Sequence, residues 1–589
     1  LRSHRAALEG WGKSCMSEPV TLDRRQAIGA LAGGAAAVAL VARGVPGNAG
    51  KGDPFAGGDG RAAAARPADG GAYASRDESY AAAGGGQDSA TKGEAPTLLF
   101  ATGGEAAAAT RVTVPTILTT DDPALHLARR ATFGPTRELV DEIHERGIDG
   151  WLARQMEPAA IPDPRADQVW GAFPLASADP PTIRAAIGRS KWDAMTDYGV
   201  ATVGRQVWSQ RQLYEVMVDF WANHLNVPTP GPGGWDVAVS YHNDVIRAHA
   251  LGSFTDMLLG AARHPAMLRY LGAAQSTKEA VNENLGRELL ELHTVGIGSG
   301  YTEQDVRNSA YILTGRTVVG EQGPGVEGTF TYDARKHWTG AVTVLDFGHD
   351  NASPEGGLEV GEAYLRHLAA HPATAQTIAR KLAVRLVSDM PPQPLVDRLA
   401  TAYLDGGTAI APVLDVLFRS AEFWASVGQK TRRPLENIVA SARAVGIQPG
   451  DDIRGGLTGL ANRAHGAGHR PLAWPAPNGY PDVHGAWRSA GGLLALWNNH
   501  RAVVGGWHEG LAFTEAHDLA AGMPTGTVGE YVDSLCQLLC FQLFDPPRRE
   551  ALVGYLGGDP AASSQRAGLE WKSHELAALV LDSPYFALR

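Results

Sequence analysis

The run Asn-Glu-Asn-Leu-Gly-Arg-Glu-Leu-Leu-Glu-Leu-His, from Asn282 to His293, is the stretch around which the rest of the chain is organised. Its leucines at 285, 289 and 292 recur at the spacing of one helical face, which predicts a helix over 282–293. The charged residues of this stretch stand inside a long apolar neighbourhood, unlike those of an ordinary surface helix. We therefore expect a helix that faces the interior or a cleft.

The polar residues of this predicted helix share one face. They follow one another at i, i+3, i+4 and i+7: Asn284, Arg287, Glu288 and Glu291. Glu283 lies four residues before Arg287, so the guanidinium could bridge carboxylates on either side. Desolvation on such a face would shift the pKa values of the carboxyl groups, which favours a catalytic or binding role. A structural ion-pair network that holds the helix to its neighbours is the alternative.

Composition indicates a soluble globular protein of one large or two medium domains. Of 589 residues, 44% are hydrophobic and 20% charged, which is ordinary for a soluble chain. The formal net charge is -11 and no run of Lys and Arg occurs in the body of the chain, so we expect no nucleic acid partner. Three cysteines exclude a disulfide scaffold, and Cys536 and Cys540 are expected to be two buried thiols on one helix face.

Residues 1–50 resemble an export signal of the twin-arginine type. The pair Arg24-Arg25 precedes an apolar run, Gly29–Ala42, which is too short to span a bilayer as a permanent helix. Met16 would place the arginine pair near a start site, so residues 1–15 could be an upstream mis-start. We expect export by the twin-arginine route, a periplasmic or extracellular location and no permanent membrane span. An N-terminal anchor that is never cleaved is the alternative.

The rest of the chain divides into a linker and a folded body. Residues 51–118 are rich in Gly and Ala and hold few large apolar side chains, which predicts a disordered linker. Residues 119–589 are predicted to be mainly α, a large multi-helix globular domain. The clear strand patterns, Thr329–Tyr332 and Ala341–Phe347, predict a small β-hairpin excursion from it.

Two kinds of helix start can be read in the body. Thr302 is expected to cap a helix with Asp305 reaching back to it. His-Pro-Ala occurs at His264–Ala266 and at His371–Ala373, each time with Pro at the first helical position. His371 is therefore expected to be a cap, in preference to a metal ligand.

Several short segments occur in a fixed order along the body: Arg129–Pro135, Asn282–Gly296, Gly300–Val306, Leu313–Gly315, His371–Ala375, Lys381-Leu382 and Pro477–Pro481. This ordered set resembles the bacterial family catalogued as domain of unknown function eighteen hundred, from about Leu125 to the C-terminus. The resemblance implies an exported bacterial protein, often encoded beside another uncharacterised exported family, and no activity. The family pattern has His-Asp after a Phe-x-Tyr strand, whereas here His337 is followed by Trp338.

The acidic helix suggests carboxylate chemistry. Glycoside hydrolysis needs one protonated acid and one ionised partner across the scissile bond. The candidate catalytic residues are Glu288, Glu291, Glu283, Arg287 and Asp219, with Asp305 as a further partner carboxylate. Candidate substrate-binding residues, including aromatic side chains that could stack on sugars or belong to the core, are Asn223, His224, Asn282, Asn284, Trp221, Trp338, Asn478 and Tyr480. The function expected is a hydrolase acting on an extracellular polymer such as a glycan.

Three alternatives remain open. A divalent metal is the one cofactor that the sequence suggests, since carboxylate and imidazole groups are ligands of hard or borderline ions. Its candidate ligands are His224, Glu288, Glu291, His293 and His337. The metal could assist hydrolysis or serve a redox protein. The third alternative is a non-catalytic binding or assembly partner of a co-exported protein. No Gly-x-Ser-x-Gly elbow, P-loop or dinucleotide fingerprint supports other chemistry in the body.

Overall fold

A computed structural model of the protein describes residues 121–186, 191–321, 323 and 325–589. The predicted export signal, 1–50, and the predicted linker, 51–118, lie outside the described residues. The described residues all belong to one compact unit.

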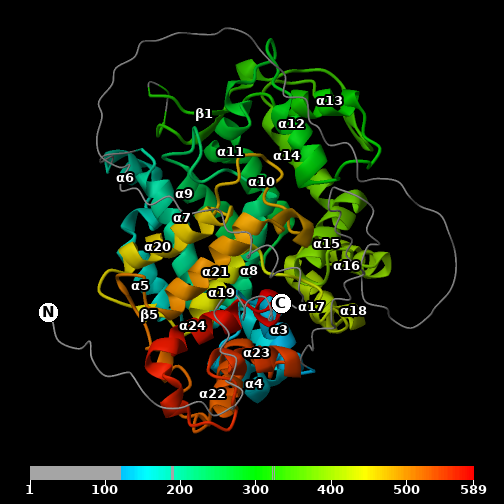
Figure 1. The fold of residues 1–589 in the computed structure, drawn as a ribbon. Helices are drawn as coiled ribbons and strands as arrows, with labels where there is room; N and C mark the ends of the chain where they lie inside the picture. Colours follow the sequence, from blue (N-terminus) through cyan, green and yellow to red (C-terminus); the bar gives the residue numbers. More distant parts are fainter. Residues whose placement is uncertain (1–120, 187–190, 322, 324) are drawn as a thin grey trace, which may run out of the picture. The chain divides into compact units, whose positions relative to one another are not determined.

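The described part of the chain is mainly α-helical, as predicted (Figure 1). Up to the central stretch, the α-helices are α3 (Pro123–Ala131), α4 (Arg137–Met156), α5 (Pro164–Ala172), α6 (Pro180–Ala185), α7 (Asp193–Trp208), α8 (Gln212–His224), α9 (Ala238–Ser240), α10 (Phe254–Arg263), α11 (Pro265–Tyr270) and α12 (Asn284–Glu288). After it follow α13 (Glu303–Leu313), α14 (Gly357–Ala370), α15 (Pro372–Leu386), α16 (Gln393–Asp405), α17 (Ile410–Arg419), α18 (Ala421–Trp424), α19 (Pro434–Ala444), α20 (Ile453–Gly466), α21 (Ala490–Val504), α22 (Val528–Cys540), α23 (Pro546–Tyr555), α24 (Leu569–Leu581) and α25 (Pro584–Ala587). Two π-helical turns, η3 (Tyr241–Arg247) and η5 (Leu289–His293), extend α9 and α12.

Local capping explains where several helices begin. The side chain of Asp122 accepts a hydrogen bond from the backbone of Ala124 at the start of α3. Thr302 and Asp305 form the predicted capping box of α13. The His371 side chain accepts from the Ala373 backbone, so its predicted role as a cap of α15 is confirmed.

The strands among the described residues form three separate two-stranded antiparallel sheets. These pair β1 (Arg316–Val318) with β2 (Phe330–Tyr332), β3 (Val342–Val344) with β4 (Phe347–His349), and β5 (Gln448–Pro449) with β6 (Leu511–Ala512). The two predicted strand patterns therefore do not pair with each other. The first pairs with β1, which lies upstream, and the second folds back on itself through a turn in which Leu345 adopts φ 52°.

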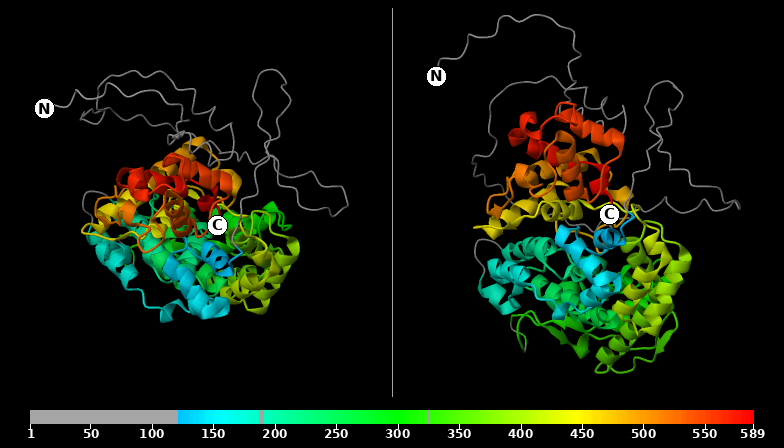
Figure 2. Two further views of the ribbon diagram at one scale, coloured as in Figure 1. Left: turned by 60° about the horizontal axis from the view of Figure 1, so that its bottom comes forward. Right: turned by 90° about the horizontal axis from the view of Figure 1, so that it is seen from below.

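Helices far apart in the sequence pack together around the central elements. In the right-hand view of Figure 2, α19 and α20 (yellow) lie between α7 on one side and the C-terminal helices (red) on the other. Helix α19 contacts α7, α20 and α21, and α21 in turn packs on α24. Helix α12 packs on α13, and α15 packs on α16 (Figure 1). Across the described ranges, no helix combines the length and hydropathy needed to cross a membrane.

Candidate functional site

The predicted central helix changes type at Leu289. Helix α12 covers Asn284–Glu288, and the π-helical turn η5 continues it over Leu289–His293. The prediction of one helical segment is confirmed in position, but its second half is a wider turn than an α-helix. Thr294 follows with a non-helical backbone, and its hydroxyl donates to the Leu289 carbonyl at 2.7 Å. Such turns free backbone groups for other contacts and often mark functional sites.

Arg287 holds a network of carboxylates on the surface of this helix. Its guanidinium lies 2.7 Å from Glu303, 3.3 Å from Glu291 and 3.5 Å from Glu283. The side chain of Arg287 is 31% exposed and that of Glu303 is 69% exposed, so water screens these pairs. The hydrogen bond to Glu303 is the largest influence that raises the pKa of Arg287. Through these ion pairs Arg287 joins α12 to the start of α13.

Glu288 differs from its charged neighbours. It is half-buried, and no hydrogen bond or ion pair holds its carboxyl group within the described part of the chain. Burial, followed by the nearby charge of Glu291, raises the pKa of Glu288. Tyr270 lies close enough that the Glu288 charge adds to the effect of burial in raising the pKa of the tyrosine. Glu288 is therefore a carboxyl group that is easier to protonate than an ordinary glutamate.

The π-helical turn is bound by a pair of side chains from distant helices. Nε2 of His224 lies 3.0 Å from the His293 carbonyl, which can only accept, so Nε2 carries the proton. Nδ1 of His224 then accepts from the amine of Lys381 at 2.9 Å, and this amine also donates to the Leu292 carbonyl at 3.1 Å. Burial lowers the pKa of Lys381 to about 8. Burial, and then Lys381, hold the pKa of His224 well below its ordinary value.

His293 is buried close to the pair formed by His224 and Lys381. It is 2% exposed, and its Nε2 atom has no hydrogen-bond partner among the residues described. Burial, and then Lys381, lower the pKa of His293 to about 3, against the opposing effect of a backbone hydrogen bond to Pro477. The two histidine rings, 6.2 Å apart between centroids, are thus both uncharged at neutral pH.

The end of α8 holds the segment 474–480 in place. The Asn223 side chain exchanges two hydrogen bonds with the backbone of Tyr480, at 2.8 and 2.6 Å. Asn226 donates to the carbonyls of Trp474 and Ala476 at 2.9 and 2.7 Å. The structure therefore brings together the predicted residues Asn223, His224, Asn478 and Tyr480, although Asn223 binds protein backbone. The side chain of Asn478 accepts from the indole of Trp474 at 2.8 Å.

Five other residues predicted to form the site contact neighbouring groups of the protein itself. Trp221 is fully buried and donates to the Ala250 carbonyl, while Trp338 stacks on Tyr311 with 4.4 Å between ring centroids. The buried ring of His337 uses Nδ1 with the Thr314 carbonyl and Nε2 with Asn351. Asn282 and Asn284 flank the helix start, where the Asn282 side chain accepts from the Asn284 backbone at 2.9 Å.

The candidate metal ligands do not converge. Over the ranges that the structure describes, no group of three or more His, Cys, Asp or Glu could hold a metal ion. Both ring nitrogens of His224 and both of His337 are already hydrogen-bonded within the protein. These two histidines therefore have no ring nitrogen left to bind a metal together with Glu288, Glu291 and His293. The donor set proposed from the sequence is therefore not assembled as a site.

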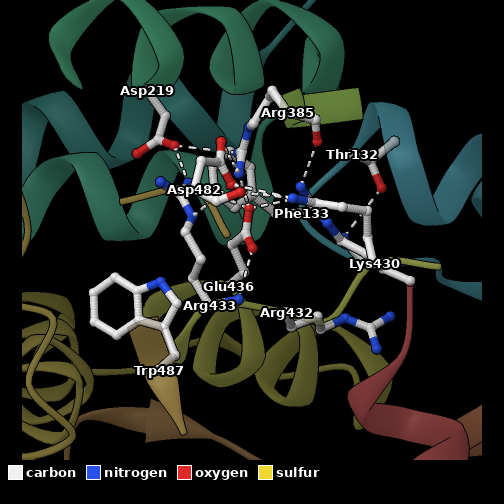
Figure 3. Close-up of polar contacts among 12 residues, drawn as sticks. Thr132, Phe133, Asp219, Arg385, Lys430, Arg432, Arg433, Glu436, Asp482 and Trp487 are labelled. Atoms are coloured by element: carbon white, nitrogen blue, oxygen red, sulfur yellow. Dashed lines mark hydrogen bonds and ion pairs between the residues drawn. The ribbon is translucent and has the colours of Figure 1, made fainter. Parts of the chain in front are cut away.

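A buried charge cluster, which the sequence did not reveal, lies beside the same end of α8 (Figure 3). Glu436, at the start of α19, ion-pairs with Arg385, with Arg433 at 3.3 Å and with Arg589 at 2.8 Å. Asp219 pairs with Arg433 at 2.5 Å and with Arg385 at 3.2 Å. Arg385, Arg433 and Arg589 outweigh the penalty of burial and hold the pKa of Glu436 well below its ordinary value.

Asp219 is thus an ion-pair partner within this cluster, and its carboxylate is committed to two arginines. Asp482 joins from the 474–487 region, with its carboxylate 3.7 Å from Arg385 and 3.8 Å from Arg433. His469, 2% exposed, is stacked on Trp487 at 4.9 Å and tilted against Tyr480 at 4.2 Å. Through these ion pairs the cluster joins α8, α15 and α19 to this loop. Residues as far apart as Asp219 and Arg433 carry no local sequence signal of such a contact.

Cavities provide a further test of the predicted cleft. Four cavities in the described regions, of about 640, 540, 330 and 40 Å³, are lined by residues other than Glu288 and Glu291. The largest lies between α4 and the segment 207–212. Glu288 therefore lies outside these cavities.

Comparison with known proteins yields one match. The family model described as Protein of unknown function (DUF1800) matches residues 126–588, from α3 almost to the last residue. No curated protein and no solved structure matches the chain.

Proposed function

We propose that this chain, which belongs to the DUF1800 family, is an exported hydrolase that acts on an extracellular polymer such as a glycan. Glu288 is the proposed proton donor and Glu291 its proposed ionised partner. One observation carries the proposal: Glu288 is a half-buried carboxyl group without a hydrogen-bond or ion-pair partner among the described residues, and burial raises its pKa.

The two carboxyl groups are suited to opposite roles. A general acid must hold its proton near neutral pH, and the raised pKa of Glu288 favours this state. Glu291 is ion-paired with Arg287 at 3.3 Å, and it is the proposed partner carboxylate. In the proposed reaction Glu288 protonates the leaving oxygen as the glycosidic bond breaks. The carboxylate of Glu291 takes a proton from the attacking water.

Aromatic side chains near Glu288 support a sugar substrate. Tyr270 and Tyr301 are close enough to Glu288 for its charge to affect their pKa values. Tyr270 donates to the Pro475 carbonyl at 2.8 Å, which brings the segment that contains Trp474 to the same side. An aromatic ring offers an apolar face to the C–H groups of a sugar, while its polar edge bonds to hydroxyls.

The test compares Glu288→Gln with a control variant at an exposed carboxylate outside the Arg287 network. We expect Glu288→Gln to lower turnover of a susceptible polysaccharide by about 10²–10⁴-fold, the usual contribution of a general acid. Glu279→Gln, which removes a 70% exposed carboxylate, should change turnover less than twofold. Release of reducing ends from a panel of glycans measures the rates, and a melting curve checks that each variant is folded. Equal turnover in wild type and Glu288→Gln would overturn the proposal.

A second candidate function is favoured by one observation. Glu288 and Glu291 lie outside the cavities described above, and the acids around Arg287 are partly exposed. An exposed acidic face suits a non-catalytic assembly partner of a co-exported protein. Wild-type protein that is folded but releases no reducing ends from any glycan in the panel would favour this candidate.

A further inference from the structure

A second candidate site lies over α20, away from the acidic helix in the sequence. A cavity of about 540 Å³ is bounded by the helix on one side and by residues 507–509 on the other. This volume falls within the range of about 300–1,000 Å³ that ligand pockets occupy. Its lining is Asp452, Gly455, Gly456, Gly459, Asn462, Arg463, Trp507, His508 and Glu509.

Glycines let residues 507–509 approach the helix closely. A Cβ atom at Gly459 would lie 3.0 Å from Nδ1 of His508, and one at Gly456 would lie 2.4 Å from the Leu511 side chain. Gly455, by contrast, is exposed at the cavity. The glycine face alone is explained by this packing, so the case for a ligand depends on the side chains around it.

His508 is the one buried polar side chain among the residues that line the cavity. It is 5% exposed, it lines the cavity, and its Nε2 atom has no hydrogen-bond partner in the part of the chain described. Burial lowers the pKa of His508 to about 4, so the ring is uncharged at neutral pH. An uncharged imidazole needs one acceptor and one donor, and a hydroxyl group can supply either.

Trp507 supplies an apolar plate beside these polar groups. The residue is 52% exposed, whereas tryptophan side chains are highly buried on average. The guanidinium of Arg501 lies 5.2 Å from the centre of the indole, which fixes the ring at the edge of the cavity. The exposed indole lies near the amide of Asn462 and the carboxylates of Asp452 and Glu509. Such a surface can bind a ring that has apolar faces and polar edges.

The charged residues that line the cavity indicate which class of ligand it can bind. Asp452 and Glu509 are acidic and Arg463 is basic, so the cavity carries a small excess of negative charge and is ill suited to an anion. Its polar lining is equally ill suited to an apolar ligand. A neutral ring rich in hydroxyl groups satisfies both conditions.

We propose that the cavity over α20 is a saccharide-binding subsite. A sugar ring lies against the indole of Trp507, and its hydroxyls bond to His508, Asn462 and Glu509. This subsite is built from other residues than the proposed catalytic carboxylates, so it binds sugar whether or not Glu288 is catalytic.

The experiment measures binding of neutral hexasaccharides of glucose, N-acetylglucosamine and mannose by calorimetry. We expect wild type to bind at least one of them, Trp507→Ala to lose at least tenfold in affinity, and Glu509→Gln to lose severalfold. Both altered residues are exposed, so their fold should persist. Trp571→Ala is the matched control because Trp571 is 64% exposed and carries a lysine 5.0 Å from its ring.

Two results would overturn the proposal. One is a wild-type protein that binds none of the three hexasaccharides, and the other is an affinity equal in Trp507→Ala and Trp571→Ala. Glu288→Gln is expected to bind as wild type does. Binding that depends on Trp507, together with absent turnover, would refute the proposed hydrolase and leave this subsite standing.

Discussion

Lys381 donates a hydrogen bond to Nδ1 of His224 across 2.9 Å, and no carboxylate in the described ranges forms an ion pair with this amine. The amine is held instead by an uncharged ring and by the Leu292 carbonyl. A cation at the end of a helix is favoured by the helix dipole, yet desolvation acts against its charge. The pKa values of both groups are therefore lower than usual, so each side chain loses its proton more readily than it would in water.

The first prediction follows from the pKa of Lys381. Burial lowers it from 10.5 to about 8, so between these values the unfolded chain holds a proton that the native chain does not. The free energy of unfolding of wild type should therefore rise with pH across this window, relative to that of Lys381→Met. Denaturant titrations from pH 7 to 10 measure the difference. Lys278→Met, which alters a 45% exposed lysine, should run parallel to wild type, and a parallel Lys381→Met curve would contradict the assignment.

The second prediction concerns Glu288, whose pKa is raised above the ordinary value of 4.5. The stability that this group contributes is fully present below 4.5 and is lost as pH rises through the native value. We therefore expect Glu288→Gln to gain melting temperature relative to wild type between pH 4.5 and 7.5.

Glu303→Gln is the opposite case, because its hydrogen bond to Arg287 lowers the pKa of Glu303. The stability from Glu303 is present above 4.5 and is lost on acidification, so this variant should fall behind wild type as pH rises. Melting curves at four pH values test both variants, and slopes of the same sign would refute the argument.

The third prediction concerns the buried charge cluster. Glu436→Gln leaves the guanidinium groups of Arg385, Arg433 and Arg589 without their shared carboxylate, which should cost about 3–5 kcal/mol of unfolding free energy. Glu422→Gln removes an exposed pair with Arg398 and should cost about 1 kcal/mol or less. Urea titrations of the two variants compare these costs. A similar small loss in both would show that the cluster is well hydrated.

The fourth prediction tests the contact between α12 and α13. A Cβ atom at Gly286 would lie 2.8 Å from the backbone nitrogen of Ala310, so Gly286→Ala should destabilise the protein by about 1–3 kcal/mol. Gly171, an exposed glycine in α5, has no atom within 4 Å of its ideal Cβ position. Gly171→Ala should therefore stabilise by about 0.5–1 kcal/mol, since alanine loses less backbone entropy. Thermal unfolding separates the two signs.

Local features of this fold could be predicted from the sequence because they depend on near neighbours. The capping box of Thr302 and Asp305 is encoded within three residues, and so is the cap that His371 provides. The central stretch was predicted as a helix from the spacing of its leucines. The change to a π-helical turn at Leu289 was not, because it depends on contacts from α8 and α15.

The candidate site shows the same division. The interactions of Glu283 and Arg287 lie one helical turn apart and could be foreseen as either catalytic or structural. The contact of Asp219 with Arg433 joins residues 214 apart, and that of His224 with Lys381 joins residues 157 apart. No periodicity in the chain encodes such separations. The sequence marks Lys381 only as part of a segment that resembles the family, and its lowered pKa arises from burial that the fold creates.

Asn223 and His224 are neighbours in the chain, yet they hold two different segments. Asn223 binds the backbone of Tyr480, and His224 binds the carbonyl of His293. The end of α8 is thus a common anchor, and neither segment can leave it without releasing a bond to the same helical turn. We expect the two segments to open together in hydrogen exchange, as one cooperative unit that spans both halves of the described chain.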